Sequence, residues 1–90
     1  MKKYMIERDI PGVGALSPDA RKAAAAASNA ALAQLAPRVQ WQQSYVAQDK
    51  TFCVYLAEDE AVIHEHARLS GFPATRITPL ADGLDPSSAG

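Results

Sequence analysis

The chain has 90 residues, which supports one small domain, because a unit of this size buries only about 60–65% of its unfolded surface. Nine Lys and Arg against ten Asp and Glu give a formal net charge of −1, so the sequence has no basic footprint for nucleic acid. No apolar run has the length of a signal peptide or a membrane span. We therefore expect a cytoplasmic protein that binds neither nucleic acid nor membrane.

The first part of the chain predicts a strand followed by a helix. Lys3 to Ile10 alternates in a strand pattern and ends at a Pro-Gly turn. Ser17 and Pro18 then supply an N-cap hydroxyl and a proline at the first helical position. Good helix formers continue to Ala36. The alanines at 23–27 leave a thin surface, which predicts that this helix lies close against a sheet.

The second part predicts a hairpin, a helix and a final strand. Val39 to Ala47 and Thr51 to Ala57 are rich in β-branched and aromatic residues, and a Gln-Asp pair between them favours a turn. Asp59 is a candidate N-cap for a helix that runs to Ser70. Ala74 to Leu80 is flanked by prolines, which suits an edge strand because proline donates no backbone hydrogen bond.

This order of elements predicts an α+β fold of the ferredoxin-like β-α-β-β-α-β type. Its four-stranded antiparallel sheet has the first and third strands in the centre and both helices on one face. We expect residues 1–80 to form this single domain and residues 81–90, which are small, polar and broken by a proline, to form a flexible C-terminal tail.

Alternation along the third strand predicts which side chains face the helices. Phe52, Val54 and Leu56 are its more apolar set, so we expect them to meet the helices and Cys53 to lie on the uncovered face. If Tyr4 and Ile6 of the first strand also face the helices, Glu7 joins Cys53 on that uncovered face. A face of this kind exposes apolar area, and the sequence therefore favours a homodimer formed through it. A monomer that exposes a few aromatic side chains is the alternative.

The two histidines are predicted to have different surroundings. Residues two apart on a helix are turned by about 200°, so His64 and His66 cannot point at one site. Val62, His66 and Leu69 define a buried stripe, whereas His64 lies in a polar row. A histidine beside an apolar stripe is most often a hydrogen-bonded core residue, with a ligand or acid/base role as the alternative.

A thiolate, an imidazole and a carboxylate form a donor set suited to nickel, zinc or copper. Here the candidates are Cys53, a histidine, and Glu7 or Glu65. Because Cys53 is expected across the sheet from His66, ligands from two chains would remove the conflict. The spacing His64-x-His66 is not a metal-binding pair by itself, and these groups can equally be structural.

Several sequence blocks link the chain to a known family. They are Glu7-Arg8, Trp41 to Val46, Asp49-Lys50, Cys53 to Tyr55, Asp59-Glu60, and Glu65 to Arg68 followed by Gly71 to Ala74. From Tyr4 to Leu80 the chain resembles the small bacterial nickel-binding proteins, a family with a ferredoxin-like fold that was formerly a domain of unknown function. The resemblance implies a dimeric nickel-binding protein without a settled catalytic role. It supports Glu7, Tyr45, Cys53, Glu65 and His66 as metal ligands, and His64 less.

Three functions are consistent with the sequence. The first is a homodimeric protein that binds a divalent transition metal and serves in sequestration or metal response. Nickel is the expected metal, with zinc or copper as alternatives. The second is a small enzyme that uses the uncovered sheet face as a pocket, with Tyr45, His66 and Glu7 as acid/base groups. The third is a structural or interaction module in which the cysteine and histidines only pack. The metal-binding function is the one that the resemblance favours, and it assigns no catalytic residue.

Overall fold

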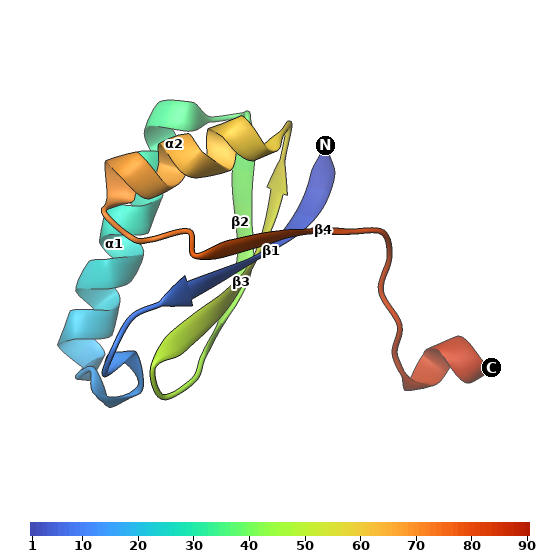
Figure 1. Cartoon of the computed structure of the whole chain (residues 1–90), viewed down its shortest axis with the longest axis horizontal. Coiled ribbons are helices and arrows are strands. Elements are labelled where there is room, and N and C mark those ends of the chain that lie inside the picture. The colour runs from blue at the N-terminus through green and yellow to red at the C-terminus, as the bar shows by residue number, and fades with distance from the viewer.

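The sheet is the frame on which the rest of the molecule is built. A computed structural model describes residues 1–90. Its elements in chain order are β1 (Lys2–Asp9), the 3-10 helix η1 (Val13–Ala15), α1 (Pro18–Leu35), β2 (Val39–Val46), β3 (Lys50–Ala57), α2 (Glu60–Ser70), β4 (Arg76–Leu80) and the 3-10 helix η2 (Pro86–Ala89). All strand pairs are antiparallel in the order β2-β3-β1-β4, and both helices cover one face (Figure 1). The ferredoxin-like prediction is confirmed.

The helix boundaries follow from capping residues that the sequence identifies. The Ser17 hydroxyl accepts a hydrogen bond from the Ala20 amide at 3.1 Å, and the Asp59 carboxylate accepts one from the Val62 amide at 3.0 Å. Both contacts satisfy amides that have no partner within the helix. At the end of α2, Gly71 has a φ of 80°, a left-handed conformation that glycine adopts without steric cost.

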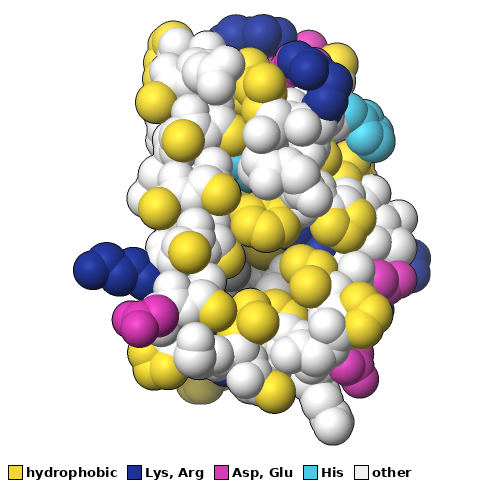
Figure 2. Space-filling model, turned by 90° about the vertical axis from the view of Figure 1, so that its left-hand side faces the viewer, with side chains coloured by type: hydrophobic (Ala, Val, Ile, Leu, Met, Phe, Trp, Pro, Cys, Tyr) yellow, Lys and Arg dark blue, Asp and Glu magenta, His cyan; other side chains and the backbone are white.

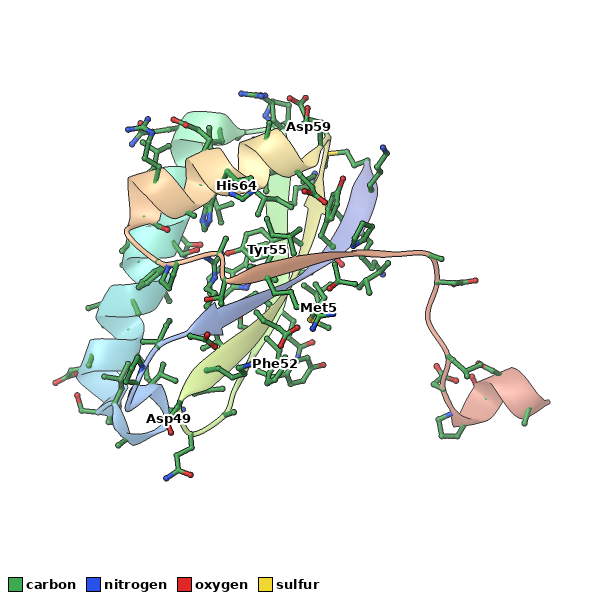
Figure 3. The ribbon with its side chains drawn as sticks, in the orientation of Figure 1. Met5, Asp49, Phe52, Tyr55, Asp59 and His64 are labelled. Carbon is green, nitrogen blue, oxygen red and sulfur yellow. The ribbon has the colours of Figure 1, made fainter.

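The strand register reverses the predicted faces of β3. Cys53 lies opposite Ile6, and Tyr55 lies opposite Tyr4. Directly opposed residues share a face, and Tyr4 and Ile6 are buried under the helices as expected. Cys53 and Tyr55 therefore face the helices, and the expectation that Phe52, Val54 and Leu56 do so is wrong. Figure 3 shows Tyr55 between the sheet and the helices, with Met5 and Phe52 on the other side.

The reason for the reversal lies in the polar tips of the inward residues. The hydroxyl of Tyr55 lies 3.4 Å from that of Ser28, and the hydroxyl of Thr51 lies 3.5 Å from the Cys53 sulfur. Burying a polar atom costs little free energy when the atom has a hydrogen-bond partner. Thr51, Cys53 and Tyr55 can therefore face the helices as well as Phe52, Val54 and Leu56 could. Hydrophobicity alone did not separate the two faces of this central strand.

The core lies between the sheet and the two helices. Its buried members are Tyr4, Ile6, Leu35, Val39, Cys53, Tyr55, Ala57, Val62 and Ile63. On α2, Val62 and His66 are buried and Leu69 packs against the core, while His64 is exposed. The predicted separation of the two histidines is therefore confirmed.

The last ten residues leave the body of the domain after β4 and end in η2 (Figure 1). None of residues 81–90 is buried. The Asp85 carboxylate accepts hydrogen bonds from the Ser87 amide and hydroxyl, which hold η2 locally. Neither long helix has the length and apolarity needed to cross a membrane.

Candidate functional site

The first part of the site is a buried polar chain that links the two helices to the sheet. His66 has no exposed surface, and its Nε2 lies 3.2 Å from the Ser28 hydroxyl on α1. That hydroxyl also lies 3.4 Å from the Tyr55 hydroxyl, and the rings of Tyr55 and His66 meet edge to face with centroids 5.2 Å apart. The second ring nitrogen, Nδ1, is buried without a partner.

Burial decides the protonation states of the two titratable side chains in this buried polar chain, His66 and Tyr55. It lowers the pKa of His66 to about 4, and the positive charge of Arg8 acts in the same direction. Burial also raises the pKa of Tyr55, an effect that its contacts with Ser28 and Arg8 oppose. Both side chains are consequently neutral at pH 7.

Cys53, the predicted sulfur ligand, lies on the same side of the sheet as His66. It is 4% exposed, and its sulfur lies 3.5 Å from the Thr51 hydroxyl. Its cross-strand neighbour is Ile6 and not Glu7, so the expectation that Glu7 and Cys53 share the uncovered face is wrong. The expectation that the sheet separates Cys53 from His66 is wrong for the same reason.

Glu7 lies on the open face of the sheet, within an ionic group. Its carboxylate lies 3.2 Å from the Lys50 ammonium and 3.9 Å from the Arg76 guanidinium. Along the strand register, Tyr45, Phe52, Glu7 and Arg76 form one row across the four strands. Tyr45 is 55% exposed, so this row joins a carboxylate and an accessible phenol on one surface.

Glu65 and His64 occupy the outer surface of α2. Both carboxylate oxygens of Glu65 lie 3.1 Å from the Arg68 Nε, one turn further along the helix. This guanidinium lowers the pKa of the Glu65 carboxyl. His64 is exposed on the same helix, as Figure 3 shows.

The six candidate ligands therefore fall into three separate places. Cys53 and His66 are in the interior, Glu7 and Tyr45 are on the open face, and His64 and Glu65 are on α2. No group of three His, Cys, Asp or Glu side chains comes together within the chain. A single copy does not fit a nickel ion with a complete set of protein ligands, because such an ion takes several ligands in a fixed geometry.

The structure also contains a cavity that the sequence did not predict. It has a volume of about 270 Å³ and is lined mainly by hydrophobic residues of α1, η1 and the helix-covered face of the sheet. Figure 2 shows the hollow, with hydrophobic side chains around its mouth. Ala24 and Ala25 form part of its wall, so the expectation that the alanine stretch lies close against the sheet is not met there.

Arg8 is the residue of this cavity that sequence reasoning passed over. It alternates with Tyr4 and Ile6 in β1, which places it on the buried face, and it is only 3% exposed. That phase in the strand was the available signal. The acid/base groups of the enzyme hypothesis, Tyr45, His66 and Glu7, do not line the cavity.

Comparison with known proteins places this geometry in a family. No curated protein matches the chain. The chain is similar to the crystal structure of SCO4226 from Streptomyces coelicolor A3(2), with a TM-score of 0.71, 20% identity, and coverage of 91% of this chain and 99% of that one. Residues 4–80 match the model of the family described as nickel responsive protein SCO4226-like. The chain therefore belongs to the SCO4226-like family of nickel-responsive proteins.

Proposed function

We propose that this protein binds nickel as a homodimer and serves in nickel sequestration or in the response to nickel. The observation that carries the proposal is the match of residues 4–80 to a nickel-responsive family. The donor types support it, because imidazole, thiolate and carboxylate are all ligands of divalent nickel, zinc and copper. The proposal places the protein in the cytoplasm, where a lone thiol such as Cys53 stays reduced.

The open face of the sheet supports pairing of two copies. Met5, Phe52, Val54 and Leu56 lie on it half-buried, although no element of the chain covers them. The reversal of β3 makes this face more apolar than the sequence suggested. A second copy would remove that apolar area from water.

Two-fold pairing can also bring together candidate ligands that lie apart in a single copy. In a symmetric dimer whose two-fold axis passes between Glu7 and Tyr45, these two residues of one copy lie near Tyr45 and Glu7 of its partner. In the proposal these four groups supply the ion site between the copies, and His64 and Glu65 are further accessible donors. Cys53 and His66 are the interior candidates, which an ion reaches only by entering the domain.

Calorimetric titration of nickel into the protein tests both groups of ligands. One variant, Glu7→Gln with His64→Gln, removes surface donors, and another, Cys53→Ser with His66→Gln, removes interior donors. Loss of a ligand is expected to weaken nickel binding at least about tenfold, since even indirect partners of a metal contribute that much. Glu60→Gln, an exposed acid of α2 outside the candidate set, is the matched control.

The outcome separates the possibilities clearly. Weaker binding in the surface variant supports a site between copies, and weaker binding in the interior variant moves the site into the domain. Nickel affinity that is unchanged in both variants, or no nickel uptake by the wild type, overturns the proposal. Zinc and copper titrations measured alongside show whether the site prefers nickel, because copper binds more tightly at most nitrogen and sulfur sites.

A further inference from the structure

The cavity beside α1 is separate from the surface donors discussed above, and its walls differ in chemistry. Ala24, Ala25 and Val13 contribute apolar surface from the helical side, while Thr51 and Ser44 contribute hydroxyls from the sheet. No Asp or Glu lines it. Its volume of about 270 Å³ lies near the lower end for sites of small organic molecules.

Arg8 is a buried cation without a counter-ion at this cavity. Its Nη1 donates hydrogen bonds to the backbone oxygens of Phe72 at 3.3 Å and Pro73 at 3.0 Å, and its guanidinium lies 5.7 Å from the centre of the Tyr55 ring. Its Nη2 is buried and has no partner. Buried guanidinium groups are ordinarily paired with an acid, because an unpaired charge in a low-dielectric interior is costly.

The neighbours of Arg8 do not neutralise it. The guanidinium of Arg8 lies 5.7 Å from the centre of the Tyr55 ring, a contact with a π face that brings no carboxylate to the cation. Thr51 and Ser44 supply hydroxyls that can donate to an acceptor. The lining of the cavity thus provides two guanidinium groups, Arg8 and Arg21, and several hydroxyl donors, with no Asp or Glu.

We propose that this cavity binds a small organic carboxylate, with its hydrocarbon body against Ala24, Ala25 and Val13 and its carboxylate at the guanidinium of Arg8, which lines the cavity. The apolar walls account for the body, and the unpartnered guanidinium nitrogen accounts for the charge. A charge-assisted hydrogen bond is strongest where water is excluded, which is the situation of this residue. The surface donors do not line the cavity, whereas Cys53, an interior candidate ligand, does. The proposal does not depend on nickel binding, because the carboxylate is placed at Arg8.

A pair of probes that differ only in charge tests the proposal. Hydrocinnamate and its neutral amide, hydrocinnamamide, have the same hydrocarbon body, and their binding to the full chain is measured by amide chemical-shift titration in metal-free buffer. The carboxylate is expected to bind at least about tenfold more tightly, the ratio that one charge-assisted hydrogen bond gives. Its largest shifts are expected at Thr51, Ser44 and the α1 residues that line the cavity. Equal affinities for the two probes, or shifts confined to the open sheet face, overturn the proposal.

Variants locate the site. Ala25→Leu fills the cavity and is expected to abolish binding of both probes, while Ala26→Leu, on the exposed side of the same helix, leaves it intact. Arg8→Met keeps the length of the side chain without its charge, and is expected to remove the preference for the carboxylate. Carboxylate binding that survives Ala25→Leu contradicts the proposal even if Arg8→Met does not fold.

Discussion

At the scale of single residues, the interior of this small domain is notable for its polar side chains. Arg8, Ser28, Thr51 and His66 are all buried. Ser28 joins the Tyr55 hydroxyl to His66 Nε2 and so partly satisfies both, whereas Arg8 Nη2 and His66 Nδ1 have no partner. Unsatisfied buried atoms lower stability, so these residues set how the fold responds to pH and to ligands.

His66 predicts a specific dependence of stability on pH. Its pKa is about 4 in the folded protein against 6.5 for an ordinary histidine. Well above pH 6.5 the imidazole is neutral in both the folded and the unfolded protein, so it does not change the stability. As the pH falls from 6.5 to 4 the unfolded chain takes up the proton first, so the folded state loses stability. The loss is about 2–3 kcal/mol, measured as the free energy of unfolding in urea at pH 7 and pH 4.

The contribution of His66 is isolated by comparing variants. His66→Gln removes the titrating ring, so its stability is expected to fall less between pH 7 and pH 4 than that of the wild type. His64→Gln, two residues away on the exposed surface, keeps the wild-type difference. Identical pH profiles for the wild type and His66→Gln contradict the assignment.

Residue-level prediction from the sequence was uneven for physical reasons. Helix geometry separated His64 from His66, because the angle between residues on a helix is fixed. The face of Cys53 was predicted wrongly, since both faces of β3 are apolar enough to be buried. The role of Arg8 at a cavity was missed, because a cavity depends on how far α1 stands from the sheet, and sequence periodicity does not report that spacing.

At the scale of elements, prediction was more successful, because caps and turn residues are local signals. Helix α1 begins after Ser17 and α2 after Asp59, as the capping patterns indicate. The predicted strand at 74–80 is shorter in the structure, where β4 begins at Arg76. In β2, an irregularity between Trp41 and Gln43 shifts the register. Such a bulge inserts one residue into the strand, and alternation alone does not reveal it.

The cap of α2 is expected to contribute measurably to stability. Asp59, which Figure 3 labels at the start of α2, accepts a hydrogen bond from the Val62 amide at 3.0 Å. Asp59→Ala therefore leaves that amide without its partner. The expected cost is about 1 kcal/mol in the free energy of unfolding by urea. Asp85→Ala removes a comparable cap from η2 in the exposed tail and is expected to change global stability little. Equal losses in the two variants would show that the cap of α2 is not the cause.

The contact between η1 and the β2–β3 turn requires a glycine. A Cβ at Gly14 would lie 2.7 Å from the backbone oxygen of Ala47 and 2.9 Å from the Cα of Gln48. Since both atoms belong to the backbone, Gly14→Ala is expected to push η1 away and cost about 1–3 kcal/mol of unfolding free energy.

Gly83→Ala is the matched control, because a Cβ there meets open space. Thermal unfolding of the two variants measures the difference directly. A Gly14→Ala protein as stable as Gly83→Ala would mean that the turn moves aside without strain.

At the scale of the whole molecule, the two faces of the sheet carry different features. The helix-covered face contains the core, the buried polar chain and the cavity beside α1. The open face carries an apolar surface together with the Glu7 ionic group. Because the candidate ligands are divided between these faces, the proposed nickel site depends on a second copy of the chain.

Native mass spectrometry tests whether nickel is held between two copies, with protein purified without an affinity-metal step and then incubated with nickel. It reports the number of chains, the identity of the ion and the number of ions in one spectrum. An ion site shared by two copies predicts a dimer that retains nickel, with the ion lost when the dimer dissociates into monomers. A monomer that binds nickel by itself, or a dimer that takes up none, would contradict it.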